Sequence, residues 1–132
     1  MNQDRPKRVL VVDDDADTTE LTALVLGGAG YEVHQAHSGL EALEKVNALS
    51  PDLVLLDINM DAMDGWETLR LLRVDDATHD LPVAMFSVRY DIREKLQGIQ
   101  LGATDYITKP FAHDDLVQRV RRIFESLPAA PG

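Results

Sequence analysis

Two short apolar segments that each end in aspartate constrain the fold of this chain most strongly. Residues 9–12 (VLVV) lead into Asp13 and Asp14, and residues 53–56 (LVLL) lead into Asp57. A continuous run of Val and Leu is typical of a strand buried on both faces, as in a parallel sheet. In open parallel α/β sheets, functional groups gather beyond the carboxyl ends of the strands. The sequence therefore predicts that Asp13, Asp14 and Asp57 lie together at one edge of a sheet.

The rest of the chain alternates between strand-like and helix-like segments. Further strands are predicted over residues 32–36, 83–86 and 103–108. Helices are predicted to begin at Asp15 or Asp17, at capping-box motifs at 38–41, 64–67 and 91–94, and shortly before Leu116. We expect a flavodoxin-like (βα)5 fold, a doubly wound five-stranded parallel sheet in the order 2-1-3-4-5. Residues 1–132 would form a single domain, with a core over about 7–127 and a flexible tail at 128–132.

Composition excludes several classes of function. There are 13 basic and 23 acidic residues, for a net charge of −10, which argues against general affinity for nucleic acid or anionic membranes. The absence of cysteine excludes disulfides and thiolate metal sites. No apolar run approaches the roughly 20 residues of a spanning helix, and the first residues show no signal-peptide core. We expect a cytoplasmic protein without membrane insertion.

The three aspartates need a partner of opposite charge. Two carboxylates about 4 Å apart repel each other by roughly 4 kcal/mol at an effective dielectric constant near 20. Oxygen-only ligands favour a hard cation, Mg²⁺ before zinc. Asp13 and Asp14 also suit a helix N-terminus, where the backbone dipole favours acids. Asp57 is harder to explain in that way, and an aspartate can act as a nucleophile toward phosphorus.

Other strand ends carry residues that suit the same chemistry. Lys109 ends the fifth predicted strand and could offset the acids and hold a phosphoryl oxygen, although a surface lysine is the ordinary alternative. Ser87 ends the fourth strand and is either a turn hydroxyl or a hydrogen-bond donor to that phosphoryl group. Tyr106 is either a core aromatic residue or a movable ring. The four strand ends together indicate a site.

These residues resemble the receiver domain of two-component response regulators, from Lys7 to about Leu127. The matching motifs are VVDD at 11–14, Asp57 with Asn59 and Met60, MDG at 63–65, FS at 86–87, GATDY at 102–106 and KPF at 109–111. The resemblance implies a phosphoprotein in a two-component system or phosphorelay. It implies that Asp57 takes a phosphoryl group from a sensor histidine kinase or a phosphotransfer protein, as an aspartyl phosphate. The chain would catalyse its own phosphorylation and dephosphorylation without being a conventional turnover enzyme.

The resemblance also implies a role for each site residue. Asp14, Asp57 and the backbone carbonyl of Asn59 would bind Mg²⁺, or Mn²⁺ in its place, and Asp13 would act through a water molecule. Lys109 and Ser87 would hold phosphoryl oxygens. Ser87 and Tyr106 would form a two-position switch that reshapes the face around the fourth and fifth helices. That face would bind a downstream protein or form a homodimer, since no output domain follows in this sequence.

Some residues depart from the family pattern, and the sequence lacks the motifs of other proteins with related folds. Asp61 replaces the usual proline, Val88 a smaller residue, and Ala112 a helix-capping residue. A flavodoxin needs a phosphate loop without acids, and a dinucleotide site needs a glycine motif that opens a helix. A phosphatase would need an acid where Asn59 stands. The main alternative is a receiver-fold interaction module that works without phosphorylation.

Overall fold

The computed structural model describes residues 5–60, 62–87, 96, 99–108 and 112–127. The helix predicted from residue 91 lies largely outside these ranges. Lys109 and the two departures at Asp61 and Val88 also lie outside the described residues.

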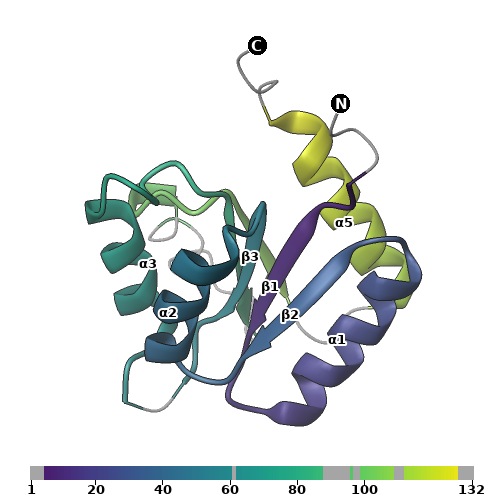
Figure 1. The fold of residues 1–132 in the computed structure, drawn as a ribbon, viewed down its shortest axis with the longest axis horizontal. Helices are drawn as coiled ribbons and strands as arrows, with labels where there is room; N and C mark the ends of the chain where they lie inside the picture. Colours follow the sequence, from purple (N-terminus) through teal and green to yellow (C-terminus); the bar gives the residue numbers. More distant parts are fainter. Residues whose placement is uncertain (1–4, 61, 88–95, 97–98, 109–111, 128–132) are drawn as a thin grey trace.

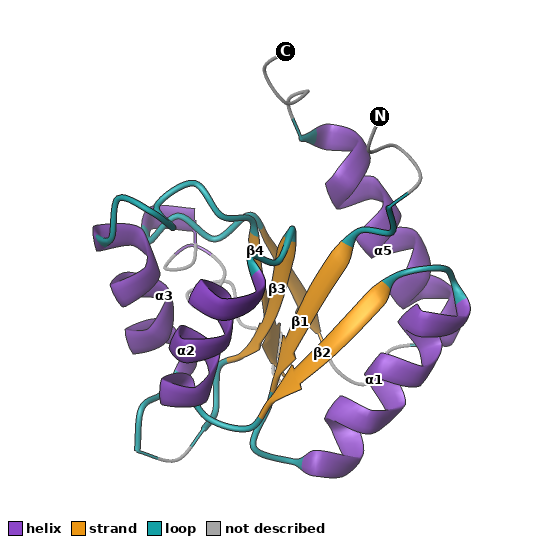
Figure 2. Ribbon diagram, viewed as in Figure 1, coloured by secondary structure: helices purple, strands orange, loops and turns teal. Residues whose placement is uncertain are grey.

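The strands form the sheet that the sequence predicts. They are β1 (Arg8–Val12), β2 (Glu32–Ala36), β3 (Leu53–Asp57), β4 (Val83–Ser87) and β5 (Asp105–Thr108). All neighbouring pairs are parallel and the order is β2-β1-β3-β4-β5, so the predicted five-stranded parallel sheet is confirmed (Figure 2). β5 begins two residues later than predicted. Just before β5, the Thr104 N–H donates to the Val83 carbonyl (2.7 Å), but the Val83 N–H donates to the Thr104 hydroxyl (3.1 Å) and not to a backbone carbonyl.

Helices cover both faces of the sheet. α2 (Gly39–Leu49) and α3 (Gly65–Val74) pack on one face, and α1 (Ala16–Gly28) and α5 (His113–Ser126) pack on the other (Figure 1). Alternate residues of β1 enter the two cores, with Leu10 and Val12 facing α2 and α3, and Val9 and Val11 facing α1 and α5. All four are fully buried, which explains their uninterrupted apolar sequence. None of the described helices has the length and hydropathy needed to span a bilayer.

Side-chain caps begin three of the helices where the sequence predicts them. Asp15 caps α1, Ser38 accepts from the Glu41 N–H at the start of α2, and Asp64 accepts from the Glu67 N–H at the start of α3. The expected return bond of the capping box at 38–41 differs. Glu41 accepts from the backbone N–H of His37 (2.7 Å), one residue earlier than the box requires. Helix α5 has no side-chain cap at Ala112, as expected.

Helix α1 buries threonine and exposes leucine. Thr19 and Thr22 are among its buried residues, whereas Leu21 and Leu24 are 47% and 75% exposed. Apolar residues lie all round this helix, so the 3.6-residue period does not mark one buried face. The two buried hydroxyls differ. Thr19 donates to the Ala16 carbonyl (3.0 Å), whereas the Thr22 hydroxyl has no hydrogen-bond partner among the described residues.

We predict opposite effects on stability for valine at these two positions. Thr22→Val removes a buried hydroxyl that lacks a partner and should raise the free energy of unfolding by about 1 kcal/mol. Thr19→Val has the same change in shape but removes a made hydrogen bond, and should lower it by about 1 kcal/mol. Urea unfolding followed by circular dichroism measures both. A loss of stability in Thr22→Val would contradict the prediction.

Candidate functional site

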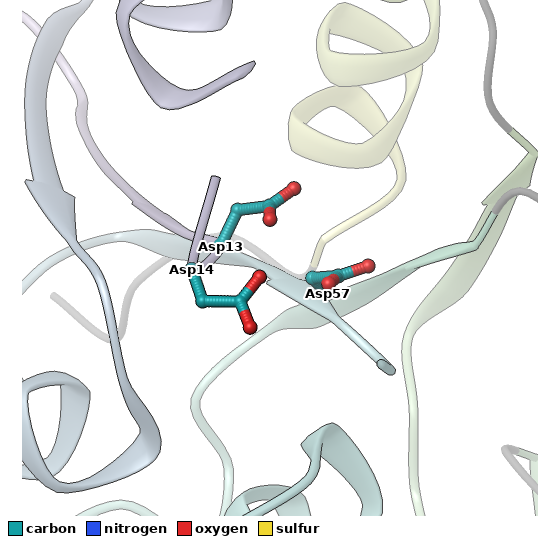
Figure 3. Close-up of side chains that lie close together, drawn as sticks. All are labelled: Asp13, Asp14 and Asp57. Carbon is teal, nitrogen blue, oxygen red and sulfur yellow. The ribbon is translucent and has the colours of Figure 1, made fainter. Parts of the chain in front are cut away.

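Three carboxylates meet at the carboxyl ends of two neighbouring strands. Asp13 and Asp14 follow β1 and Asp57 ends β3, and Val12 pairs with Leu56 in the ladder between these strands. A carboxylate oxygen from each residue lies within 4.8 Å of the others (Figure 3). Asp13 and Asp57 are only 2% and 5% exposed, while Asp14 is exposed. The structure therefore brings together the three acids that the sequence places at one sheet edge. We call them the acid cluster.

Hydrogen bonds hold the chain at Asp13 and just after Asp57 to neighbouring strands. The Asp13 N–H donates to the Ala36 carbonyl at the end of β2 (3.1 Å). Asp13 Oδ1 accepts from the Asp15 N–H (3.0 Å), which turns the chain into α1. Just after Asp57, the Ile58 N–H donates to the Phe86 carbonyl of β4 (3.0 Å). Asp13, just after β1, is therefore bonded to β2, and the peptide after Asp57 is bonded to β4.

The donor set of the acid cluster fits a hard divalent cation. All its ligand atoms are carboxylate oxygens, and two of the three side chains are buried. Buried carboxylates this close together repel one another strongly, and a bound cation offsets that repulsion. Oxygen donors suit Mg²⁺ or Mn²⁺, not a soft metal. The site also lies at the point where the strand order reverses, which is where open α/β sheets bind ligands.

The structure places the other predicted site residues in part. Tyr106 lies on β5 and is 6% exposed, within the core that faces α2 and α3. Ser87 is the last residue of β4 and pairs with Thr108, but only its backbone is described. Asn59 is exposed in the chain that follows β3. Lys109, next in sequence to Thr108, lies outside the described residues, so its predicted place beside the acids remains a prediction.

Glu41 lies in the first turn of α2 and has a different role from the acid cluster. The hydrogen bond from the His37 backbone N–H is the main cause that lowers the pKa of the Glu41 carboxyl, and the nearby Lys45 ammonium (3.1 Å) acts in the same direction. This carboxylate is therefore used to fix the turn between β2 and α2.

Gly65, the first residue of α3, is a site neighbour that the sequence did not predict. A Cβ atom built there would lie only 2.3 Å from the Asp57 carbonyl oxygen. The sequence marked it only as the last residue of the MDG motif at 63–65, directly after a helix-capping aspartate. Only the packing of α3 against β3 reveals its contact with the site.

Fold and site together define a doubly wound α/β protein with an acidic cation-type site at the switch point of its sheet. Residues 9–121 match the family model described as the response regulator receiver domain. The chain therefore belongs to the receiver domain family of response regulators, as its sequence motifs suggested.

Individual relatives agree with this assignment. The chain is 37% identical over 124 residues to the DNA-binding dual master transcriptional regulator RpaA of Synechocystis, covering 94% of this chain and 52% of that protein. It is 42% identical over 115 residues to the DNA-binding response regulator MtrA of Mycobacterium tuberculosis, covering 87% of this chain and 49% of MtrA. The chain thus spans about half the length of these relatives.

Two solved structures show the same fold over nearly their whole length. The chemotaxis protein CheY4 of Vibrio cholerae matches with a TM-score of 0.85 and 31% identity, covering 89% of this chain and 98% of CheY4. A putative response regulator from Chloroflexus aurantiacus matches with a TM-score of 0.86 and 40% identity, covering 92% and 99%.

Proposed function

We propose that this chain is a phosphorylation-dependent signalling switch in which Asp57 accepts a phosphoryl group from a histidine kinase. The observation that carries the proposal is the acid cluster, with its carboxylate oxygens within 4.8 Å of one another at the ends of β1 and β3. Asp57 ends β3, and its side chain lies beside those of Asp13 and Asp14, which follow the neighbouring strand β1 (Figure 3). A sensor kinase or a phosphotransfer protein, each carrying a phosphohistidine, is the proposed donor.

Each residue of the site has a proposed task in binding. Asp14, Asp57 and the backbone carbonyl of Asn59 would hold Mg²⁺, and Asp13 would contribute through a water molecule. A bound Mg²⁺ neutralises charge on the acids and on the phosphoryl oxygens that approach them. Lys109 would hold a further phosphoryl oxygen as a point charge. The exposure of Asp14 beside two buried acids supports its role as a direct ligand, because the cation must enter from solvent.

The proposed transfer is a displacement at phosphorus, in which Asp57 replaces the imidazole of the donor. An Oδ atom of Asp57 attacks the phosphorus atom, and a new O–P bond forms as the P–N bond to the donor imidazole breaks. The electron pair of that bond stays on the imidazole nitrogen, which then takes up a proton. Positioning and charge neutralisation carry most of the catalysis in phosphoryl transfer. Attachment of Asp57 to the centre of the sheet supports this role, since a rigid nucleophile loses little entropy on reaction.

We further propose that Ser87 and Tyr106 relay the change. The new phosphoryl group would draw the Ser87 hydroxyl toward it, and Tyr106 would move with it. Burial of Tyr106 to 6% exposure supports a role for its ring inside the protein. The phosphoryl group would thereby shift an existing equilibrium between two shapes of the face around the fourth and fifth helices. That face would bind a downstream protein or a second copy of the chain.

Direct contact with nucleic acid is not part of the proposal. The two relatives described above carry DNA-binding in their names, but the match spans about half of each. The net charge of −10 on this chain opposes binding to a phosphate backbone. Cytoplasmic localisation stays a prediction from the sequence.

Labelling of the wild-type chain tests the proposal. The protein is incubated with radiolabelled acetyl phosphate, with Mg²⁺ or with EDTA, and then treated with hydroxylamine, which cleaves acyl phosphates. We expect label only with Mg²⁺ and its complete release by hydroxylamine. A chain that remains unlabelled by acetyl phosphate and by phosphorylated kinases would instead favour the phosphorylation-independent interaction module.

A further inference from the structure

The first residue of helix α3 packs directly on the backbone of Asp57. Gly65 is buried, and a Cβ atom built on it would lie 2.3 Å from the Asp57 carbonyl oxygen and 2.8 Å from the Ile58 Cα atom. Real Cβ contacts are not this short, and both neighbours are backbone atoms that cannot rotate away. Any side chain at position 65 must therefore push the start of α3 and the Asp57–Ile58 peptide apart.

This contact closes the loop that follows Asp57. The Gly65 N–H donates to the Ile58 carbonyl (2.9 Å), and the Ile58 N–H donates to Phe86 of β4 (3.0 Å). The peptide after Asp57 is thus held between β4 and the start of α3. Asn59, whose carbonyl is a proposed cation ligand, lies inside the closed loop. A shift of α3 would move both Asp57 and Asn59 relative to Asp14, which follows β1.

We propose that Gly65 is a positioning residue for the acid cluster. Its lack of a side chain lets α3 rest on the Asp57–Ile58 peptide and so sets the spacing between Asp57 and the acids of β1. Cation binding and phosphoryl acceptance, the reaction proposed above on which this inference rests, both depend on that spacing. Helix propensity alone predicts that alanine at position 65 would improve α3, because alanine favours a helix over glycine by about 1 kcal/mol.

Gly39 supplies a matched control. A Cβ atom at this first residue of α2 would also be crowded, at 2.5 Å from Thr68 Oγ1 and 2.8 Å from the Met63 sulfur. Those neighbours are side-chain atoms on α3 and its preceding loop. Both glycines are buried at helix starts, and only Gly65 contacts the Asp57 backbone. A purely structural role predicts similar consequences for Gly65→Ala and Gly39→Ala.

The test compares Gly65→Ala, Gly39→Ala and the wild-type chain. Urea unfolding gives the stability of each, the fluorescence of Trp66 gives its Mg²⁺ affinity, and acetyl phosphate labelling at saturating Mg²⁺ gives the rate. We expect Mg²⁺ affinity and labelling rate each to fall about tenfold in Gly65→Ala. In Gly39→Ala both should stay within about twofold of wild type even where stability falls. An unchanged Gly65→Ala, or equal losses in the two variants, would overturn the inference.

The outcomes separate this inference from the proposed function. If the wild-type chain neither binds Mg²⁺ nor takes label, the proposed function fails. If the wild type does both and Gly65→Ala does so equally well, only the positioning role fails.

Amide hydrogen exchange in the wild type tests the inference without any risk of misfolding. If the start of α3 sets the spacing of the acids, then by reciprocity a cation held between them must stabilise the start of α3. We expect Mg²⁺ to slow exchange of the Gly65 N–H by about threefold or more. The Gly30 N–H, which donates to the Gly27 carbonyl (3.1 Å) after α1, serves as the control and should not respond. Equal exchange at Gly65 with and without Mg²⁺ would overturn the proposal.

Discussion

Asp57→Asn is expected to abolish labelling by acetyl phosphate, with the rate falling about a thousandfold or more. An amide oxygen is a poor nucleophile and cannot form the acyl phosphate, whereas its size matches the carboxylate and leaves the packing of β3 intact. The variant should also be more stable than wild type without Mg²⁺, because one of three crowded acids becomes neutral. Labelling kinetics and urea unfolding measure the two effects.

Asp64→Asn is the matched control for this variant. Asp64 lies seven positions later and caps α3 through its Oδ1 atom, which accepts from the Glu67 N–H (2.9 Å). Asparagine caps a helix about as well as aspartate, so structure and labelling should both persist. Label that survives in Asp57→Asn, or disappears in Asp64→Asn, would refute the assignment of the phosphoacceptor.

Asp14→Asn is expected to abolish the stabilisation of the chain by Mg²⁺. At about ten times its dissociation constant, a cation that binds only the folded wild type stabilises it by about 1.4 kcal/mol, which raises the melting temperature by about 4 °C. The variant lacks a proposed direct ligand and should lose this gain. Without Mg²⁺, however, the variant should be the more stable protein by about 1 kcal/mol, since Asp13 and Asp57 lose a repelling neighbour.

Asp17→Asn separates this effect from a general change of charge. Asp17 lies in the first turn of α1, outside the acid cluster, so its neutralisation changes the net charge equally. Thermal melts with and without Mg²⁺ should show the full cation response in Asp17→Asn and none in Asp14→Asn. A wild-type melting temperature that ignores Mg²⁺ would contradict the proposed cation site.

The predictable part of the structure depends on patterns local in the chain. Residues 9–12 and 53–57 are apolar without alternation because both faces of β1 and β3 are covered. Asp15, Ser38 and Asp64 begin helices because each can satisfy a free backbone N–H within three residues. At α1 the apolar residues surround the helix and do not mark the buried face, which includes Thr19 and Thr22.

The sequence by itself determined which residues could form a charged site, because acids that end buried strands of a parallel sheet must emerge at one edge. The strand order was predicted from the switch-point rule together with analogy to known folds, because periodicity alone does not fix it. Only the tertiary structure decided how close the carboxylates come and that α3 rests on the backbone of Asp57. Pairing of β1 with β3 joins residues more than 40 positions apart in the sequence. Packing of α3 on β3 joins residues about eight positions apart. Such distances depend on how whole elements pack, and no local pattern of side chains records them.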